Sequence, residues 1–238
     1  MKNLAILITI CIACVACEKK DNEEFGYKFK THFTLDSVYS DRNNYTPNIK
    51  EINTIANPNN SFNFIGTGKV DGCLKLTGSA YIECSKLFSN FLTLEKVDSL
   101  KKYSISFWFK INDVSNSAKI FTSNDRAGGG LDIYISDSLV LNYLNTNISV
   151  NHINKKFAPV NNDWNNIIIV YNSTSFSLYF NGVEVYSDNS ITKISYLSSF
   201  YFGNRNESSN LFMNLDDINI WNYPITSTEV INYYNATK

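Results

Sequence analysis

Short segments in which apolar and polar residues alternate run through most of this sequence. The clearest is 103–111, in which every second side chain is apolar: Ile105, Phe107, Phe109 and Ile111. A period of two places successive side chains on opposite faces of a β-strand, so that one face can be buried. The pattern therefore predicts sheets with one apolar face.

The same alternation, interrupted by clusters of Asn, Asp, Gly and Ser, predicts further strands over 27–35, 72–76, 80–84, 118–122, 131–135, 139–144, 165–171, 175–180, 183–186, 199–202 and 212–221. Gly78 is predicted to be the turn of a hairpin between the second and third of these segments. Asn181-Gly182 predicts another, tight hairpin, because both residues tolerate positive φ. The polar segment 36–62 is expected to be irregular.

Only the C-terminal end has the pattern of a helix. Thr226 and Glu229 have the spacing of a capping box, in which each side chain bonds to the backbone of the other residue. A short helix is therefore predicted over 230–234. Many strands with one late helix predict an all-β fold, a two-sheet antiparallel sandwich with a short C-terminal helix.

The first 17 residues have the pattern of a signal peptide. A positive start precedes an apolar run over 4–16, whereas a membrane-spanning helix needs about 20 residues. The run ends in Val15-Ala16-Cys17, which resembles the lipobox of bacterial lipoproteins, whose cysteine is acylated. Cys14 is a second candidate, but Cys17 is preferred because charged residues follow it at once. An ordinary secretory signal is the alternative.

The charged segment 18–25 resembles the tether of surface lipoproteins in Bacteroidota-type bacteria. It would be a solvated spacer between the membrane and a folded domain over 26–238. These resemblances imply an outer-membrane lipoprotein, exposed at the cell surface and held by its lipid anchor. The formal net charge of −1 gives no reason to expect nucleic acid as a partner.

Four segments in sequence carry a family resemblance: GTGKVDGCLKLTGSAY at 66–81, YSISFWFK at 103–110, the paired strands within 164–182, and LDDINIWNYPITSTEVINYY at 215–234. Together they resemble the LamG-like, concanavalin A-type superfamily of jelly rolls, over about residues 27 to 235. The resemblance implies the jelly-roll fold. It does not by itself imply a function, because this fold hosts lectins, adhesins, hydrolases and spacers.

The sequence offers no set of catalytic residues. Glycosidases on this jelly roll use two carboxylates on alternate residues of one strand, which flank the sugar bond. Asp216 and Asp217 are adjacent, and adjacent residues of a strand are expected to face opposite ways. His32 and His152 are the only histidines, so the parts for a nucleophilic triad or a histidine metal site are scarce.

The resemblance also implies a structural Ca²⁺, held by an aspartate of the last strand and by oxygens near the N-terminus. Asp217 is the candidate ligand by position, with Asp36 and Asp41 as partners. Such a cation needs several oxygen ligands, which loop carbonyls can complete. The alternative is that Asp217 faces solvent or accepts backbone hydrogen bonds.

Two cysteines remain after processing, Cys73 and Cys84. An exported protein meets an oxidising environment, where a disulfide can form. The predicted hairpin places the two side chains on opposite faces, which argues against a bond. The sequence leaves open whether Cys73 and Cys84 form a disulfide or remain free thiols.

Sugar binding needs exposed aromatic rings with amide, carboxylate or guanidinium groups nearby. The candidate ligand-binding rings are Trp108, Tyr134, Tyr143, Tyr179 and Tyr201. The polar candidates Arg126, Asn142 and Arg205 lie in segments that could border the same face or rim. Trp108 is off phase from the core residues of its strand. For each ring the alternative is packing in the core or between strands.

The resulting prediction is a surface-anchored, non-catalytic binding module that recognises carbohydrate or glycoprotein. The first alternative is a structural or protein-interaction component of an outer-membrane complex. The second is a glycan-active enzyme of unfamiliar mechanism.

Overall fold

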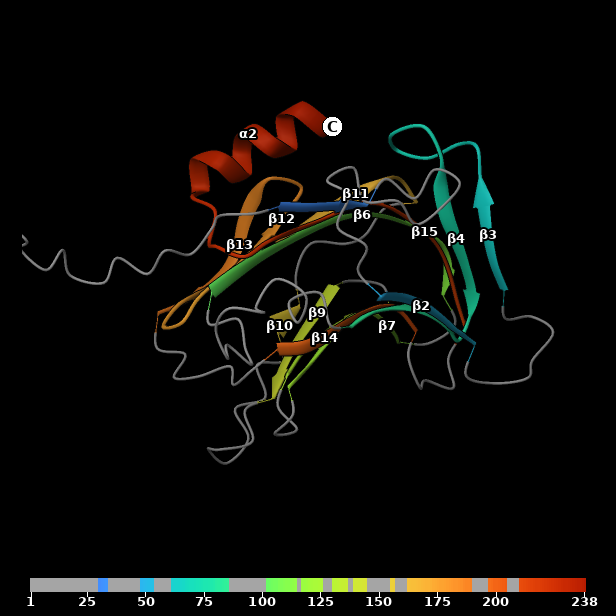
Figure 1. Ribbon diagram of the computed structural model, residues 1–238, viewed down its shortest axis with the longest axis horizontal. Helices are drawn as coiled ribbons and strands as arrows, with labels where there is room; N and C mark the ends of the chain where they lie inside the picture. The colour runs from blue at the N-terminus through green and yellow to red at the C-terminus, as the bar shows by residue number, and fades with distance from the viewer. Residues whose placement is uncertain are drawn as a thin grey trace, which may run out of the picture.

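The computed structural model describes residues 30–33, 48–53, 61–85, 102–114, 117–125, 130–136, 139–144, 155–156, 162–189, 197–204 and 210–238. Two antiparallel sheets lie face to face, and a C-terminal helix lies on the outer side of one of them (Figure 1). The predicted all-β sandwich is therefore confirmed. Among the described residues no helix is long and apolar enough to cross a membrane.

The sheet next to the helix, sheet A, has the strand order β13-β12-β11-β6-β15-β4-β3, and β1 also pairs with β15. Its strands are β1 (Lys30–Phe33), β3 (Ser61–Ile65), β4 (Cys73–Gly78), β6 (Lys102–Val114), β11 (Asn165–Asn172), β12 (Phe176–Phe180), β13 (Val183–Asp188) and β15 (Leu211–Trp221). Sheet A arches over the second sheet, with its convex side toward the helix (Figure 1).

The second sheet, sheet B, has the order β10-β9-β8-β7-β14-β5-β2. Its strands are β2 (Asn48–Asn53), β5 (Ala80–Ser85), β7 (Ala118–Asp125), β8 (Gly130–Ile135), β9 (Leu139–Leu144), β10 (Lys155–Lys156) and β14 (Leu197–Gly203).

Aromatic rings fill the space between the two sheets. Phe107 of β6 has no exposed surface, and its ring centroid lies 5.8 Å from that of Phe121 and 5.2 Å from that of Phe202. Phe121 and Phe202 come from β7 and β14 of sheet B, so these contacts join the two sheets. The alternation in β6 thus builds the core that the sequence predicts. Phe107 stacks on Phe121 and meets Phe202 edge-on, and aromatic pairs favour both geometries when the stack is offset.

The predicted hairpin around Gly78 is wrong. β4 lies in sheet A and β5 lies in sheet B, so the chain crosses from one sheet to the other at this turn. Gly78 has the positive φ of 72° that a tight turn requires, so the turn itself is confirmed. A turn signal is local and does not say whether the strands on either side pair with each other.

The prediction of an irregular segment over 36–62 is also wrong in part, because β2 and the first residues of β3 lie within it. β2 pairs with β5 at the edge of sheet B, from Asn48 opposite Ser85 to Asn53 opposite Ala80. Polar and charged residues are usual in edge strands, where they discourage pairing with other chains. Because β2 contains such polar and charged residues, its sequence lacks the apolar pattern by which a strand is predicted.

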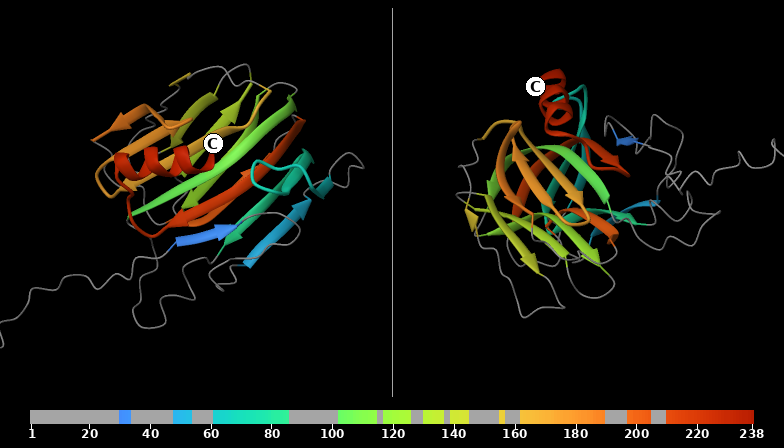
Figure 2. Two further views of the ribbon diagram at one scale, coloured as in Figure 1. Left: turned by 90° about the horizontal axis from the view of Figure 1, so that it is seen from above. Right: turned by 90° about the vertical axis from the view of Figure 1, so that its left-hand side faces the viewer.

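The helix α2 (Ser227–Thr237) begins with the predicted capping box. The Thr226 hydroxyl accepts from the Glu229 backbone N–H at 3.2 Å, and the Thr226 N–H donates to the Glu229 carboxylate at 2.6 Å. The helix is longer than predicted at both ends. It lies across part of the outer face of sheet A, where Tyr233 contacts Asp217, Asn219 and Trp221 of β15. It leaves β4, β3 and the beginning of β15 uncovered (Figure 2).

Candidate ligand-binding site

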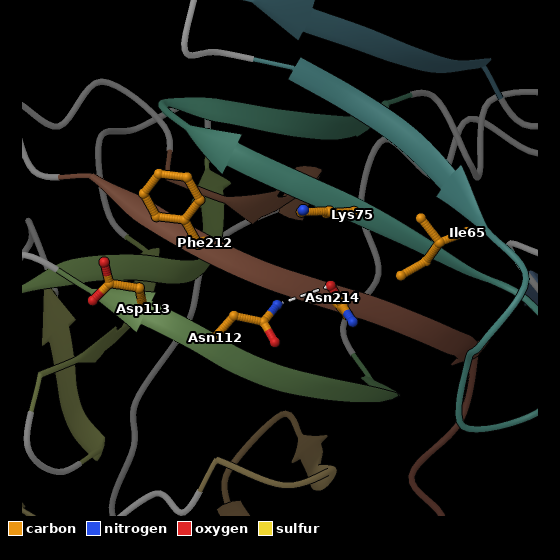
Figure 3. A pocket seen from close by; sticks show the side chains of 6 residues that line it. All are labelled: Ile65, Lys75, Asn112, Asp113, Phe212 and Asn214. Carbon is orange, nitrogen blue, oxygen red and sulfur yellow. Dashed lines mark hydrogen bonds between the residues drawn. The ribbon is translucent and has the colours of Figure 1, made fainter.

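A shallow pocket lies on the uncovered part of the outer face of sheet A (Figure 3). Its volume is about 300 Å³, and it is lined by Ile65, Lys75, Asn112, Asp113, Phe212 and Asn214. These residues come from β3, β4, β6 and β15, which are neighbours in the sheet. Phe212 and Asp113 lie at one end of the pocket and Ile65 at the other (Figure 3).

A β-bulge shapes the polar side of this pocket. Asp113 pairs with Phe212 and Ile111 pairs with Met213, so Asn112 is an extra residue in β6 without a partner in β15. A bulge bends the strand and redirects its side chains. As a result two consecutive residues, Asn112 and Asp113, are both exposed, which regular alternation would not allow.

Phe212 provides the apolar surface of the pocket. Its neighbours Leu211 and Met213 are buried in the core between the sheets, so Phe212 faces outward. Its side chain is only partly buried. An outward, partly exposed aromatic ring is the kind of surface on which the apolar face of a sugar can stack.

Two amide side chains lie beside one another in the pocket. Asn112 Nδ2 donates a hydrogen bond to Asn214 Oδ1 at 3.0 Å (Figure 3). This bond leaves Asn214 Nδ2 as a donor and Asn112 Oδ1 as an acceptor. If both amides were rotated by half a turn, the pair would still present one donor and one acceptor. Such a pair matches two adjacent sugar hydroxyls, one accepting and one donating.

Two of the predicted ligand-binding rings are not exposed. Trp108 is 2% exposed and stacks on Tyr234 of α2, with ring centroids 5.7 Å apart, and its Nε1 donates to Thr237 at 3.2 Å. Tyr179 is 7% exposed, and its hydroxyl donates to the Glu184 carboxylate at 2.9 Å. Burial, followed by the contact with Glu184, raises the pKa of Tyr179 to about 12.

The expectation of exposed rings at Trp108 and Tyr179 is therefore wrong. Both residues face away from the core, as their phase in the strands indicates. Trp108 lies beneath α2, and Tyr179 packs in the cluster that includes Ile225 and Val230. A phase argument identifies the face of a strand, but it cannot tell whether a distant segment covers that face.

Tyr134 lies on the other side of the molecule, on the outer face of sheet B. Its hydroxyl donates to Asp132 Oδ2 at 3.4 Å, and Lys119 Nζ lies 5.4 Å from its ring centroid. Lys119 also forms an ion pair with Asp132 at 3.3 Å. This ring is half-buried and is held by charged neighbours.

The remaining predicted residues do not join Tyr134 in a described site. The register pairs Asn142 with Asp132 and Tyr143 with Leu131, but the side chains of β9 are outside the description. Tyr201 is 7% exposed and packs edge-on against Tyr81. Arg126 and Arg205 lie outside the described residues. Among the residues whose side chains are described, Trp108 and Tyr179 lie on the outer side of sheet A, whereas Tyr134 lies on that of sheet B.

Asp216 and Asp217 do not face opposite ways, and that prediction is wrong. A bulge in β15 with Asp217 at a φ of 47° breaks the alternation, so both carboxylates reach the outer side. Asp216 has no exposed surface, and its Oδ2 accepts from the backbone N–H groups of Lys69 and Val70 at 2.8 and 2.9 Å.

The environment of Asp216 changes its titration. Burial raises the pKa of its carboxyl to about 7, against the opposing effect of three backbone donors. The loop between β3 and β4 lies directly on this carboxylate. A Cβ on Gly68 would meet the Gly72 carbonyl and the Asp216 carboxylate, so only glycine fits there. Asp216 thereby fixes the loop to β15.

Calcium binding stays a prediction. Asp217 is 4% exposed, and its Oδ2 accepts from the Tyr233 hydroxyl at 2.6 Å. The described residues contain no group of three or more His, Cys, Asp or Glu side chains that could hold a metal ion. The partners proposed for Asp217, namely Asp36 and Asp41, lie outside the described residues, as does Cys17.

Cys73 is a free cysteine in sheet A, whereas Cys84 belongs to β5 of sheet B. Its thiol is buried and lies 3.5 Å from the Thr67 carbonyl oxygen. Burial, together with the nearby charge of Asp216, raises the pKa of the Cys73 thiol to about 12. The thiol is therefore protonated at physiological pH.

Sequence reasoning missed the residues of the pocket, although one signal was present. Phe212 is off phase from the buried residues Met213 and Leu215, as Trp108 is in its own strand. No such signal identified Asn112 as a residue of the pocket, because its outward position depends on the bulge in β6.

The match to a family model decides the classification. Residues 77–231 match the model described as the concanavalin A-like lectin/glucanases superfamily. This chain belongs to that superfamily. Among curated proteins, none matches the sequence.

Solved structures of the same superfamily fold resemble this chain at low sequence identity. The binding domain of botulinum neurotoxin DC in complex with SialylT is 19% identical, with a TM-score of 0.66, over 89% of this chain and 51% of that one. Domain 4 of an extracellular arabinanase from Geobacillus stearothermophilus, in complex with arabinotriose, is 16% identical, with a TM-score of 0.66, over 85% and 96%.

A further neurotoxin DC structure is the binding domain in complex with rat synaptotagmin II, with 19% identity, a TM-score of 0.65, and coverage of 89% and 52%. This chain spans about half the length of the neurotoxin domains that it matches. At these identities the likeness shows the fold. The two neurotoxin structures are binding domains, and the three complexes contain SialylT, arabinotriose and rat synaptotagmin II.

Proposed function

We propose that this protein is a non-catalytic, carbohydrate-binding module and that the pocket around Phe212 contacts the sugar. The supporting observation is that one pocket combines a partly exposed ring with an amide pair that offers a donor and an acceptor. Binding sites of this kind join apolar surface with a few placed polar groups. The superfamily and the glycan complexes of similar domains favour the same function.

A protein partner is the second candidate. It is favoured by the complex of a similar neurotoxin domain with rat synaptotagmin II. In that case the protein would be a docking component of a membrane complex. Crosslinking in intact cells, followed by identification of a stable partner, separates this role from glycan capture.

The test of glycan binding is the Phe212→Ala variant. It is expected to reduce affinity about 10- to 100-fold, since burying an aromatic side chain contributes about 1.5–3 kcal/mol. Glycan-array screening of the wild-type protein identifies the ligand, and calorimetry then compares the variants, with and without EDTA. The EDTA arm tests the calcium hypothesis at the same time.

Tyr134→Ala is the matched control, because it removes a half-buried ring from the outer face of sheet B. It is expected to keep wild-type affinity. Loss of binding in Tyr134→Ala with full binding in Phe212→Ala would move the site to sheet B. A wild-type protein that binds no glycan, with or without Ca²⁺, would contradict the proposed function.

The anchoring at Cys17 is part of the proposal. The lipobox-like segment before Cys17 and the charged residues after it support a lipid-anchored protein at the outer surface of the cell. Cys17→Ala is expected to abolish acylation, measured by incorporation of labelled palmitate, and to release the protein or leave it unprocessed. Cys14→Ala is the control and should leave the label unchanged. The reverse result would make Cys14 the anchor.

A further inference from the structure

Two lysines flank the amide pair of the pocket. Lys75 of β4 and Lys110 of β6 are both register partners of Asn214, one on each side of β15. Residues directly opposite one another in antiparallel strands have Cβ atoms about 4.5–5.5 Å apart. Lys75, Asn214 and Lys110 therefore form one row across three strands, here called the lysine row.

The side chains of the lysine row all face outward. Lys75 lies between the buried residues Leu74 and Leu76, and Lys110 lies between Phe109 and Ile111 of the core. Both lysines are partly exposed. Their ammonium groups can therefore reach a ligand that lies on this face of the sheet.

Little negative charge balances the row within the described part of the chain. Neither lysine forms an ion pair with another described residue, since the ion pair found there joins Lys119 and Asp132. Asp113 belongs to the pocket but pairs with Phe212, two residues along β15 from Asn214. Asp216, on the other side of Asn214, is buried against backbone N–H groups and has a pKa raised to about 7.

We propose that the pocket selects anionic sugars, with a carboxylate or sulfate between Lys75 and Lys110. This inference rests on the proposed function and specifies its ligand class. The ring of the sugar stacks on Phe212, and its hydroxyls bond to Asn112 and Asn214. Hydrogen bonds between an ammonium group and an anion are stronger than neutral ones, so the acidic group adds affinity that a neutral sugar lacks.

The test compares an acidic ligand with its uncharged methyl ester. Trigalacturonic acid and its fully methyl-esterified form are titrated into the full-length mature protein, and a sulfated galactan oligomer tests sulfate as the source of charge. The wild-type protein is expected to bind the acid about tenfold more tightly than the ester. Added salt should weaken binding of the acid and leave that of the ester almost unchanged.

Lys75→Met and Lys110→Met remove the charge and keep most of the length of the side chain. Each is expected to lower the affinity for the acid about fivefold and to leave the affinity for the ester unchanged. Lys102→Met, at the exposed far end of β6, is the matched control and should behave like the wild type. Thermal unfolding of each variant establishes that it is folded, and Lys75→Gln serves if Lys75→Met is not.

The outcomes separate the two proposals. Equal wild-type affinity for acid and ester, with loss of both in Phe212→Ala, would overturn the anionic preference and leave the proposed function standing. The anionic preference would also be overturned, and the proposed function would stand, if Lys75→Met weakened the binding of acid and ester equally. If sulfated galactan alone shows the preference, the anion is a sulfate. Absence of binding to any sugar would overturn both proposals.

Discussion

The Trp108→Ala variant is expected to lose about 3–5 kcal/mol of free energy of unfolding while it keeps its affinity for glycan. Trp108 lies between sheet A and α2 and is 2% exposed. Its ring stacks on Tyr234, its Nε1 donates to Thr237, and Lys69 Nζ lies 4.6 Å from its ring centroid. Alanine would remove all three contacts and leave a cavity beneath the helix.

Denaturant unfolding, followed by circular dichroism, measures the loss. Trp108→Phe is the matched control, because it retains a ring for Tyr234 but lacks the N–H group, and its loss should be smaller. Phe212→Ala should show the opposite pattern, with nearly unchanged stability and weakened binding. If Trp108→Ala were as stable as the wild type and no longer bound glycan, Trp108 would be a ligand-binding residue and α2 would have to move aside.

Trp108 and Phe212 show why the fold was easier to predict than the site. Both are aromatic residues off phase in a strand with a regular apolar pattern. The pattern places both outside the core, and this is correct. Yet α2 covers Trp108 and not Phe212, and α2 follows β6 by more than a hundred residues. Local periodicity contains no information on such distant packing.

The two bulges in β15 and β6 set a second limit to prediction. Alternation holds where the residues of two strands pair one to one, as Phe109 and Leu215 do. Near Asn112 and Asp217 one strand has an extra residue, and consecutive side chains then lie on the same face. The register of the partner strand determines this, so the sequence of one strand cannot show it. The sandwich was predictable from alternation, whereas the amide pair and the placement of Asp216 and Asp217 on the same side of sheet A were not.

The buried carboxyl of Asp216 predicts an unusual dependence of stability on pH. Its Oδ2 accepts from Lys69 and Val70, and its Oδ1 accepts from the Asp217 N–H at 2.7 Å. These donors favour the charged form, but burial and the adjacent charge of Asp217 favour the neutral one, and burial has the largest effect. The pKa of Asp216 in the folded protein is therefore about 7, compared with 3.8 for an unperturbed carboxyl.

The direction of the pH effect follows from proton binding. Between about pH 4 and pH 7 the folded protein retains the Asp216 proton, whereas the unfolded chain has released it. Stability falls with rising pH wherever the folded state binds more protons. Asp216 thus contributes a loss of at most about 1.4 kcal/mol per pH unit across this interval. Below about pH 4 and above about pH 7 its contribution is constant.

Asp216→Asn isolates this contribution, because asparagine has the same size and does not titrate. Its amide cannot accept from all three donors, so the variant should be less stable than the wild type at pH 4. The difference in free energy of unfolding should shrink or reverse as the pH rises to 7, since only the wild type is destabilised by ionisation of Asp216.

Asp71→Asn is the matched control, because Asp71 is exposed in the same loop and its φ of 59° suits asparagine. Its curve should parallel that of the wild type. If the stability of Asp216→Asn also followed that of the wild type at every pH, Asp216 would be ionised across the whole interval. The effect of its three donors on its pKa would then outweigh the effect of burial.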